Sequence, residues 1–177
     1  PDEGGPGIIV DPGNFDQDLL QGVQDAGITI GAALITHPER YMHKALRTLF
    51  KIFPLEVFAG TTHIMELPCT QVTDHQVLEV GSLAVRTIPI PSHSSQSFAY
   101  RLGQLLFTGS IVHAGTLGET PNAYAEELLI AELKGLLTSA GDDTILLPSV
   151  GPPTTVRSEL HLSPYYRAID ESAHRED

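Results

Sequence analysis

The stretch ITHPERYM, residues 35–42, lies where a predicted strand meets a predicted helix. The run before it, from Ile28 to Ile35, is apolar and rich in β-branched residues, which is typical of a buried strand. After it, apolar residues recur at helical spacing from Met42 until Pro54 stops the pattern, and Pro38 suits the first turn of a helix. The sequence therefore predicts that His37 stands at a strand end, just before a helix.

An earlier segment has the same arrangement. Residues 8–10 form a short apolar run that ends at the turn DPG, residues 11–13, so they predict a buried strand followed by a turn. Asn14 and Gln17 form a capping-box-like start for the next helix, and Gly27 ends that helix. The segment therefore places Asp11 at a second strand end.

The second half of the chain predicts two hairpins and then a helix, a strand and a last helix. Each hairpin has two strand-like segments around a two-residue turn: 76–80 and 83–88 around Gly81-Ser82, and 98–102 and 105–108 around Gly103-Gln104. The later elements are predicted at residues 122–138, 144–147 and 165–173. This order favours sheets covered by helices in an α/β layered domain, and 177 residues suit one such domain.

The composition narrows the classes of partner. The chain has 10 basic and 22 acidic residues, a formal net charge of -12 and no basic run, which argues against nucleic acid and anionic membranes. Cys69 is the only cysteine, so we expect a buried structural thiol and neither an internal disulfide nor a cysteine-based zinc cluster. No apolar run approaches the ~20 residues of a membrane span, so we expect a soluble cytoplasmic protein. The missing initiating methionine suggests a chain processed or cut from something longer.

Five short segments stand at predicted strand ends, in the order IVDPG (9–13), THPERYM (36–42), PSHS (91–94), LFTGS (106–110) and LPSVGPPT (147–154). Their order resembles the metallo-β-lactamase superfamily, whose members carry an aspartate-glycine strand end, a T-H-x-H-x-D-H loop, a P-G-H-T-type turn, an F-T-G-D strand end and a P-G-H-G-P turn. The resemblance covers residues 7–165, leaves 166–177 as a C-terminal helix or tail, and implies an αββα sandwich. Family members begin with additional strands, so we expect this part of the first sheet to be missing or supplied elsewhere.

The resemblance also marks the positions of the family's metal ligands. Its first metal site corresponds to His37, Glu39 and His93, so two histidines remain and a carboxylate replaces the third. Asp11 corresponds to a residue that braces the site loops by hydrogen bonds, which is a structural role. The second metal site corresponds to Tyr41, Met42, Ser110 and Val150.

The chemistry of these second-site residues predicts that two-metal hydrolysis has been lost. A two-metal hydrolase uses two cations to make hydroxide at neutral pH and to polarise the scissile bond. Met42 offers only a soft thioether and Val150 offers no donor atom, while Tyr41 and Ser110 would have to be deprotonated. The second site is therefore predicted to be absent.

The first-site residues leave two cofactor states open. His37, Glu39 and His93 form a ligand set that suits one zinc or iron(II) ion, so the chain is expected to hold either no metal or one zinc or iron ion. His43 and His113 are close enough in sequence to the lost ligands to be candidate substitutes.

Each candidate also has a structural interpretation. His37 could cap the helix after Pro38, and Glu39 could complement the dipole of that helix or pair with Arg40. Ser94, Ser95 and Ser110 are near His93 by motif position, but the chain has no G-x-S-x-G nucleophile elbow, so a serine hydrolase is not predicted.

Three functions follow from these observations. The leading hypothesis is a degenerate metallo-β-lactamase-like domain that acts as a binding or interaction module. The alternative is a mononuclear metal-dependent hydrolase or oxidoreductase that acts on a small molecule through His37, Glu39 and His93. A third interpretation is completion by a partner, in which a second copy or another segment pairs with the strand at residues 8–10 to form a homodimer or a completed sheet.

Overall fold

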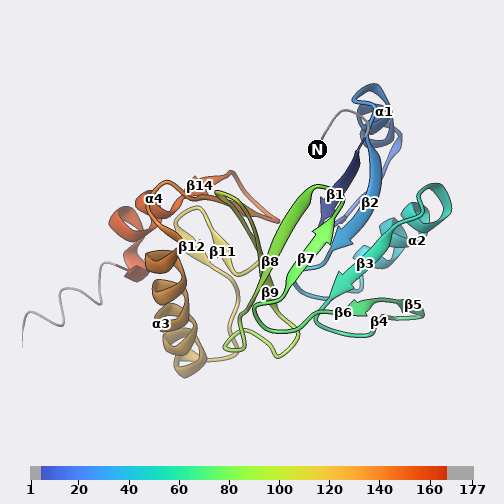
Figure 1. Ribbon diagram of the computed structural model, residues 1–177. Coiled ribbons are helices and arrows are strands. Elements are labelled where there is room, and N and C mark those ends of the chain that lie inside the picture. Colours follow the sequence, from blue (N-terminus) through green and yellow to red (C-terminus); the bar gives the residue numbers. More distant parts are fainter. Residues whose placement is uncertain (1–4, 167–177) are drawn as a thin grey trace, which may run out of the picture.

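The computed structural model describes residues 5–166, which form two facing sheets with helices on both outer sides (Figure 1). The first sheet is parallel, with the strand order β1 (Pro6–Val10), β2 (Thr29–Leu34), β3 (Glu56–Ala59) and β6 (Thr70–Gln71). The second sheet has the order β14 (Thr154–Thr155), β13 (Ile145–Pro148), β10 (Leu105–Gly109), β9 (Phe98–Leu102), β8 (Leu83–Pro89) and β7 (Val77–Val80). Two short pairs complete the strands: β4 (His63–Ile64) with β5 (Leu67–Pro68), and β11 (Val112–His113) with β12 (Thr116–Leu117).

Three clusters of buried apolar side chains hold the four layers together. Helices α1 (Gln17–Asp25) and α2 (Met42–Ile52) cover the outer face of the first sheet, where Leu46 packs with Ala33 and Ile35. Helices α3 (Ala123–Ala140) and α4 (Val156–Leu162) cover the second sheet, where Leu133 packs with Leu106. Side chains alternate along a strand, so Ala32 and Leu34 of β2 point the other way and pack between the two sheets. The predicted αββα sandwich is confirmed.

The helix boundaries differ from the prediction in three places. Helix α1 is capped by Asp16, whose side chain accepts a hydrogen bond from the Leu19 amide, and not by Asn14. Helix α2 begins at Met42 and not at Pro38, because the intervening residues form turns. Helix α4 was not predicted, and the helix predicted at 165–173 lies almost wholly outside the described residues.

The later elements agree closely with the prediction. Both hairpins are confirmed, since β7 pairs with β8 and β9 pairs with β10 around the two glycine-containing turns. Helix α3 starts after Asn122, whose side chain accepts a hydrogen bond from the Ala125 amide, and it ends at Ala140 rather than at 138.

The sheets place the predicted strand ends at one edge of the sandwich. Strands β1 and β2 run parallel, so Asp11 and Thr36 leave the first sheet on the same side. The Phe98 amide donates to the Thr36 carbonyl at 2.8 Å, and this bond joins the end of β2 to the start of β9. The two sheets therefore meet where the predicted site residues gather.

Strand β1 forms one edge of the first sheet, because within the described residues its ladder is with β2 alone. Pairing of this edge with a second copy of the chain or another segment stays a prediction. No helix among residues 5–166 is long and apolar enough to cross a membrane.

Candidate functional site

Asp11 holds together the loops around the site. Its carboxylate accepts hydrogen bonds from the Thr36 amide at 2.8 Å, the Thr36 hydroxyl at 2.7 Å and the Ser149 hydroxyl at 2.6 Å. Burial raises the pKa of Asp11 above its ordinary value, although these hydrogen bonds oppose that change. Asp11 therefore connects the ends of β1, β2 and β13.

Gly109, the last residue of β10, allows the Thr36 side chain to pack directly against the backbone of β10. Its φ is 59°, and a Cβ atom built there would lie 2.7 Å from the Thr36 Cβ. Any larger residue would therefore push Thr36 away from Asp11. The Gly109 carbonyl also accepts a hydrogen bond from the Ser149 amide at 2.9 Å, so one glycine positions two partners of Asp11.

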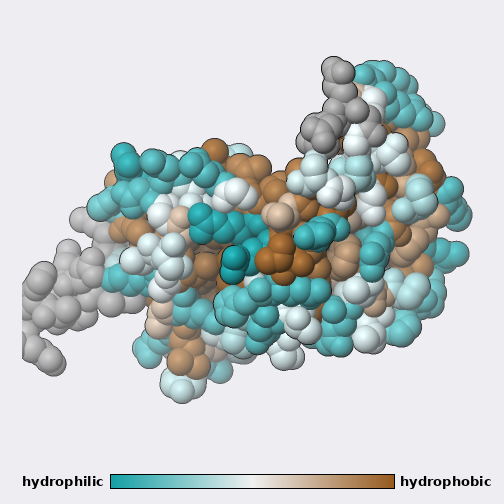
Figure 2. All heavy atoms as spheres, in the orientation of Figure 1, coloured by the Kyte–Doolittle hydropathy of each residue, from teal (hydrophilic) through white to brown (hydrophobic). Residues whose placement is uncertain are grey.

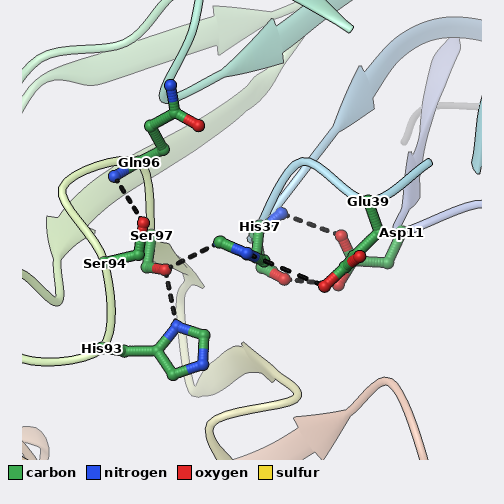
Figure 3. A network of polar contacts seen from close by, with 8 residues as sticks. Asp11, His37, Glu39, His93, Ser94, Gln96 and Ser97 are labelled. Atoms are coloured by element: carbon green, nitrogen blue, oxygen red, sulfur yellow. Dashed lines mark hydrogen bonds and ion pairs between the residues drawn. The ribbon is translucent and has the colours of Figure 1, made fainter. Parts of the chain in front are cut away.

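His37 and His93 lie side by side although they come from different sheets. Their ring centroids are 5.1 Å apart with an interplanar angle of 82°. Between them lies the Ser97 hydroxyl, whose Oγ is 3.0 Å from His37 Nδ1 and 2.7 Å from His93 Nδ1 (Figure 3). Ser97 is buried, with 1% of its surface exposed, so this hydroxyl has little access to solvent.

The Ser97 contacts couple the tautomers of the two histidines. A serine hydroxyl has one proton, so it donates to at most one Nδ1, and an Nδ1 to which it does not donate must carry a proton of its own. The Glu39 carboxylate lies 3.7 Å from His37 Nε2 and favours a proton on that atom. When His37 is neutral with its proton on Nε2, its Nδ1 accepts from Ser97, and His93 then donates from Nδ1 to Ser97.

Burial lowers the pKa of His93, and the neighbouring His37 lowers it further, whereas Glu39 acts in the opposite direction. His93 therefore favours its neutral form more than a free imidazole does. A neutral ring can keep one Nδ1 proton for Ser97 and leave the other nitrogen unprotonated.

The predicted single-metal residues do not converge on one point. Both Nδ1 atoms face Ser97, while the Glu39 carboxylate is nearest to Nε2, the other ring nitrogen of His37 (Figure 3). A metal ion needs donor atoms that meet at about 2.0–2.2 Å. Among residues 5–166, no group of three His, Cys, Asp or Glu side chains is arranged to hold a metal ion. The arrangement as it stands does not fit one.

The four positions that correspond to the second metal site are scattered. The Met42 side chain is 2% exposed and packs in the core beneath α2, so it points away from the site. Val150 is 65% exposed and Tyr41 is 57% exposed. Burial of the hydroxyl raises the pKa of Tyr41, as do the nearby Asp11 and Glu39 carboxylates, which disfavours the phenolate. Ser110, at the end of β10, is partly buried.

The two candidate substitute ligands have other surroundings. His43 Nε2 lies 2.7 Å from a Glu66 carboxylate oxygen, on the exposed side of α2. His113 lies in β11, and its buried Nε2 has no hydrogen-bond partner among the described residues. Among residues 5–166, neither side chain is hydrogen-bonded to His37 or His93. Cys69 is a partly buried thiol that packs against the core under α2.

Two residues of the site were missed by sequence reasoning, Ser97 and Ser149. Ser97 lies four residues after His93, and the turn between them brings it back because the Ser97 amide donates to the Ser94 carbonyl at 3.0 Å. Ser149 lies in the segment PSV, which resembles a family turn, and it directly precedes Val150, the residue that corresponds to a ligand position. The order of the motifs marks the ligand positions and carries no signal for the Ser97 and Ser149 hydroxyls.

Replacing Ser97 with alanine is expected to lower the free energy of unfolding by about 1–3 kcal/mol, because two half-buried ring nitrogens lose their partner. Ser95→Ala is the matched control, since Ser95 is exposed in the same turn. Denaturation with guanidinium measures both, and ¹⁵N NMR of the rings follows the tautomers. Equal stability of the two variants, with unchanged ring signals, would show that Ser97 does not hold the histidines.

Comparisons with known proteins agree with this architecture. No family model matches the chain. The chain is 23% identical to a probable metallo-hydrolase, YqgX, of Bacillus subtilis over 181 residues, which cover 89% of the chain and 86% of that protein. It is 27% identical to a hydroxyacylglutathione hydrolase of Pseudoalteromonas translucida over 121 residues, which cover 68% of the chain and 47% of that enzyme.

Solved structures match over most of the chain. The B3 metallo-β-lactamase BLEG-1 has a TM-score of 0.75 and 22% identity, covering 90% of this chain and 88% of its own. ETHE1 from Myxococcus xanthus has a TM-score of 0.73 and 22% identity, covering 94% of this chain and 80% of its own. TTHA1623 in a di-iron-bound form has a TM-score of 0.73 and 23% identity, covering 88% of this chain and 87% of its own. The chain therefore has the metallo-β-lactamase fold.

Proposed function

We propose that this domain acts as a binding or interaction module and does not catalyse metal-dependent hydrolysis. The observation that carries the proposal is the Ser97 hydroxyl, held 2.7 Å from His93 Nδ1 and 3.0 Å from His37 Nδ1. A hydroxyl that satisfies both rings stabilises them in place without an ion. The two histidines then serve to join the sheets, as Asp11 does through Thr36 and Ser149.

The second-site residues support the same proposal. A second cation would need hard donors converging beside the first, and Met42 is in the core while Val150 has no donor atom. A change of rotamer cannot bring Met42 to an ion, because its side chain is packed between α2 and the first sheet. No rotamer of Val150 gives it a donor atom. Two-metal hydrolysis would require a different set of residues.

A single-metal hydrolase or oxidoreductase is the second candidate. The adjacent rings of His37 and His93, with the Glu39 carboxylate 3.7 Å from His37 Nε2, favour it. The names of the relatives, a probable metallo-hydrolase and a hydroxyacylglutathione hydrolase, agree with such chemistry. This candidate requires the His37 ring or Glu39 to rearrange so that three donors converge.

A turnover assay separates the two candidates. The chain is incubated with a β-lactam or a hydroxyacylglutathione thioester, in excess zinc(II) or in iron(II) without oxygen, beside the His37→Ala/His93→Ala variant. We expect the wild-type chain and the variant to give the same rate as buffer with metal. A metal-dependent rate in the wild-type chain that disappears in the double variant would establish the single-metal enzyme instead.

A further inference from the structure

A groove of about 690 Å³ lies on the outer side of the second sheet, between the C-terminal half of α3 and strands β8 and β9. Ile88, Pro89 and Leu136 give it an apolar floor. Gly135 of α3 also lines it, and a Cβ atom at that position would have no neighbour within 4 Å, so a larger side chain there would extend into open space. Figure 2 shows strongly hydrophilic surface beside hydrophobic surface where α3 faces these strands.

Two arginines line this groove side by side. Arg86 of β8 and Arg101 of β9 are direct partners in the antiparallel ladder, so both side chains leave the same face of the sheet. Like charges directly opposite each other destabilise a sheet. In a chain with 10 basic and 22 acidic residues, this pairing concentrates positive charge at one place.

Arg101 is held in position by backbone carbonyls. Its Nε donates to the Gly103 carbonyl at 3.0 Å, and its Nη2 donates to the Ala140 carbonyl at 3.1 Å, at the end of α3. A guanidinium has five N–H donors, so these two bonds leave others for a ligand. Arg101 is therefore held in position and still has N–H groups that can bind a ligand.

Arg86 is exposed, and it makes no hydrogen bond or ion pair with the residues that the structure describes. Glu132 is the one acid among the residues that line the groove. Its carboxylate accepts hydrogen bonds from the Ser92 amide at 3.1 Å and from the Ser92 hydroxyl, so it is engaged with the turn before His93. No acid of the groove neutralises the two arginines by contact.

We propose that this groove binds a small organic oxyanion, a carboxylate or phosphate monoester with an apolar body. The oxyanion would lie between the Arg86 and Arg101 guanidiniums, whose planar arrays of N–H groups suit two oxygens of a carboxylate or a phosphate, and the body would contact Ile88, Pro89 and Leu136. The groove has the size of a small-molecule site. This site is separate from the histidine pair, so it does not depend on whether the domain holds a metal.

The test uses phenyl phosphate and benzoate as the anions and benzamide as the neutral control, with binding followed by NMR chemical-shift changes. We expect the wild-type chain to bind at least one anion in preference to benzamide. Arg86→Gln should weaken that binding about tenfold, the effect of one charged hydrogen bond. Gly135→Leu should weaken it without removing a charge, because its side chain would fill the groove. Tighter binding of phenyl phosphate would show that the site prefers a phosphate, and tighter binding of benzoate would show that it prefers a carboxylate.

Arg47→Gln is the matched control. Arg47 lies on α2 and is 56% exposed, and its replacement removes the same charge away from the groove. It should leave the affinity unchanged. Arg86 is exposed, so its replacement should keep the fold and relieve the cross-strand repulsion, which denaturation curves would show. The proposal is wrong if neither anion binds at about 10 mM, or if Arg86→Gln and Arg47→Gln weaken binding equally.

Discussion

Replacing Gly109 with alanine is expected to destabilise the protein by about 2–5 kcal/mol. Two effects add. An alanine at a φ of 59° is strained, and its Cβ would overlap the Thr36 side chain, which is 2% exposed and cannot move into solvent. Thr36 would be displaced from Asp11, so its two hydrogen bonds would weaken as well. Guanidinium denaturation followed by circular dichroism measures the loss.

Gly103→Ala provides the control for this experiment. Gly103 has the same φ of 59°, but a Cβ atom there would have no neighbour within 4 Å. It should therefore lose only the strain of the left-handed conformation, about 1–2 kcal/mol. If the two variants lost the same free energy, the contact between Gly109 and Thr36 would contribute nothing to stability.

Asp11→Ala is expected to cost about 2–5 kcal/mol, because three donors from the segments that follow β2 and β13 lose their acceptor. Asp11→Asn should cost much less. An asparagine oxygen can accept from the Thr36 amide, while its NH₂ group donates to the Thr36 and Ser149 hydroxyls, which are acceptors as well as donors. Both variants are compared with the wild-type chain by guanidinium denaturation at neutral pH.

The pH dependence gives a second readout for Asp11. Burial raises the pKa of this carboxyl above the ordinary value of 3.8, so the part of its contribution that depends on the bound proton is present below that pH and is lost as the pH rises through the folded value. The carboxylate still accepts its three hydrogen bonds at neutral pH. The asparagine variant lacks this loss, so its stability relative to the wild-type chain should improve as the pH rises through that range. Equal destabilisation by Ala and Asn at every pH would contradict the bracing role.

Much of the site could be predicted from the order of the motifs. Asp11, His37 and His93 each end a strand or begin a turn in a fixed sequence of elements, and the structure brings His37 and His93 to a ring distance of 5.1 Å. Parallel pairing of β1 with β2 explains how Asp11 reaches Thr36. These contacts depend on topology, which the alternation of strands and helices encodes.

Other features depended on contacts that the sequence does not mark. Met42 corresponds to a ligand position by the order of the motifs, yet its helical spacing with Leu46 and Leu49 predicts a buried face. The structure shows that Met42 is buried. Ser97 is part of no motif, and only the fold of the turn after His93 brings it between the two rings. Ser149 is 138 residues from Asp11, a separation at which local patterns carry no information.

Ser97 is proposed to satisfy the two histidines in place of an ion, and the metal content of the purified protein tests this most directly. The chain is purified without tags or chelators from medium supplemented with zinc and iron, beside the His37→Ala/His93→Ala variant, and both are measured by plasma mass spectrometry. We expect far less than one equivalent of zinc or iron in either protein. About one equivalent in the wild-type chain that is lost in the double variant would contradict the claim, since a mononuclear site binds one ion.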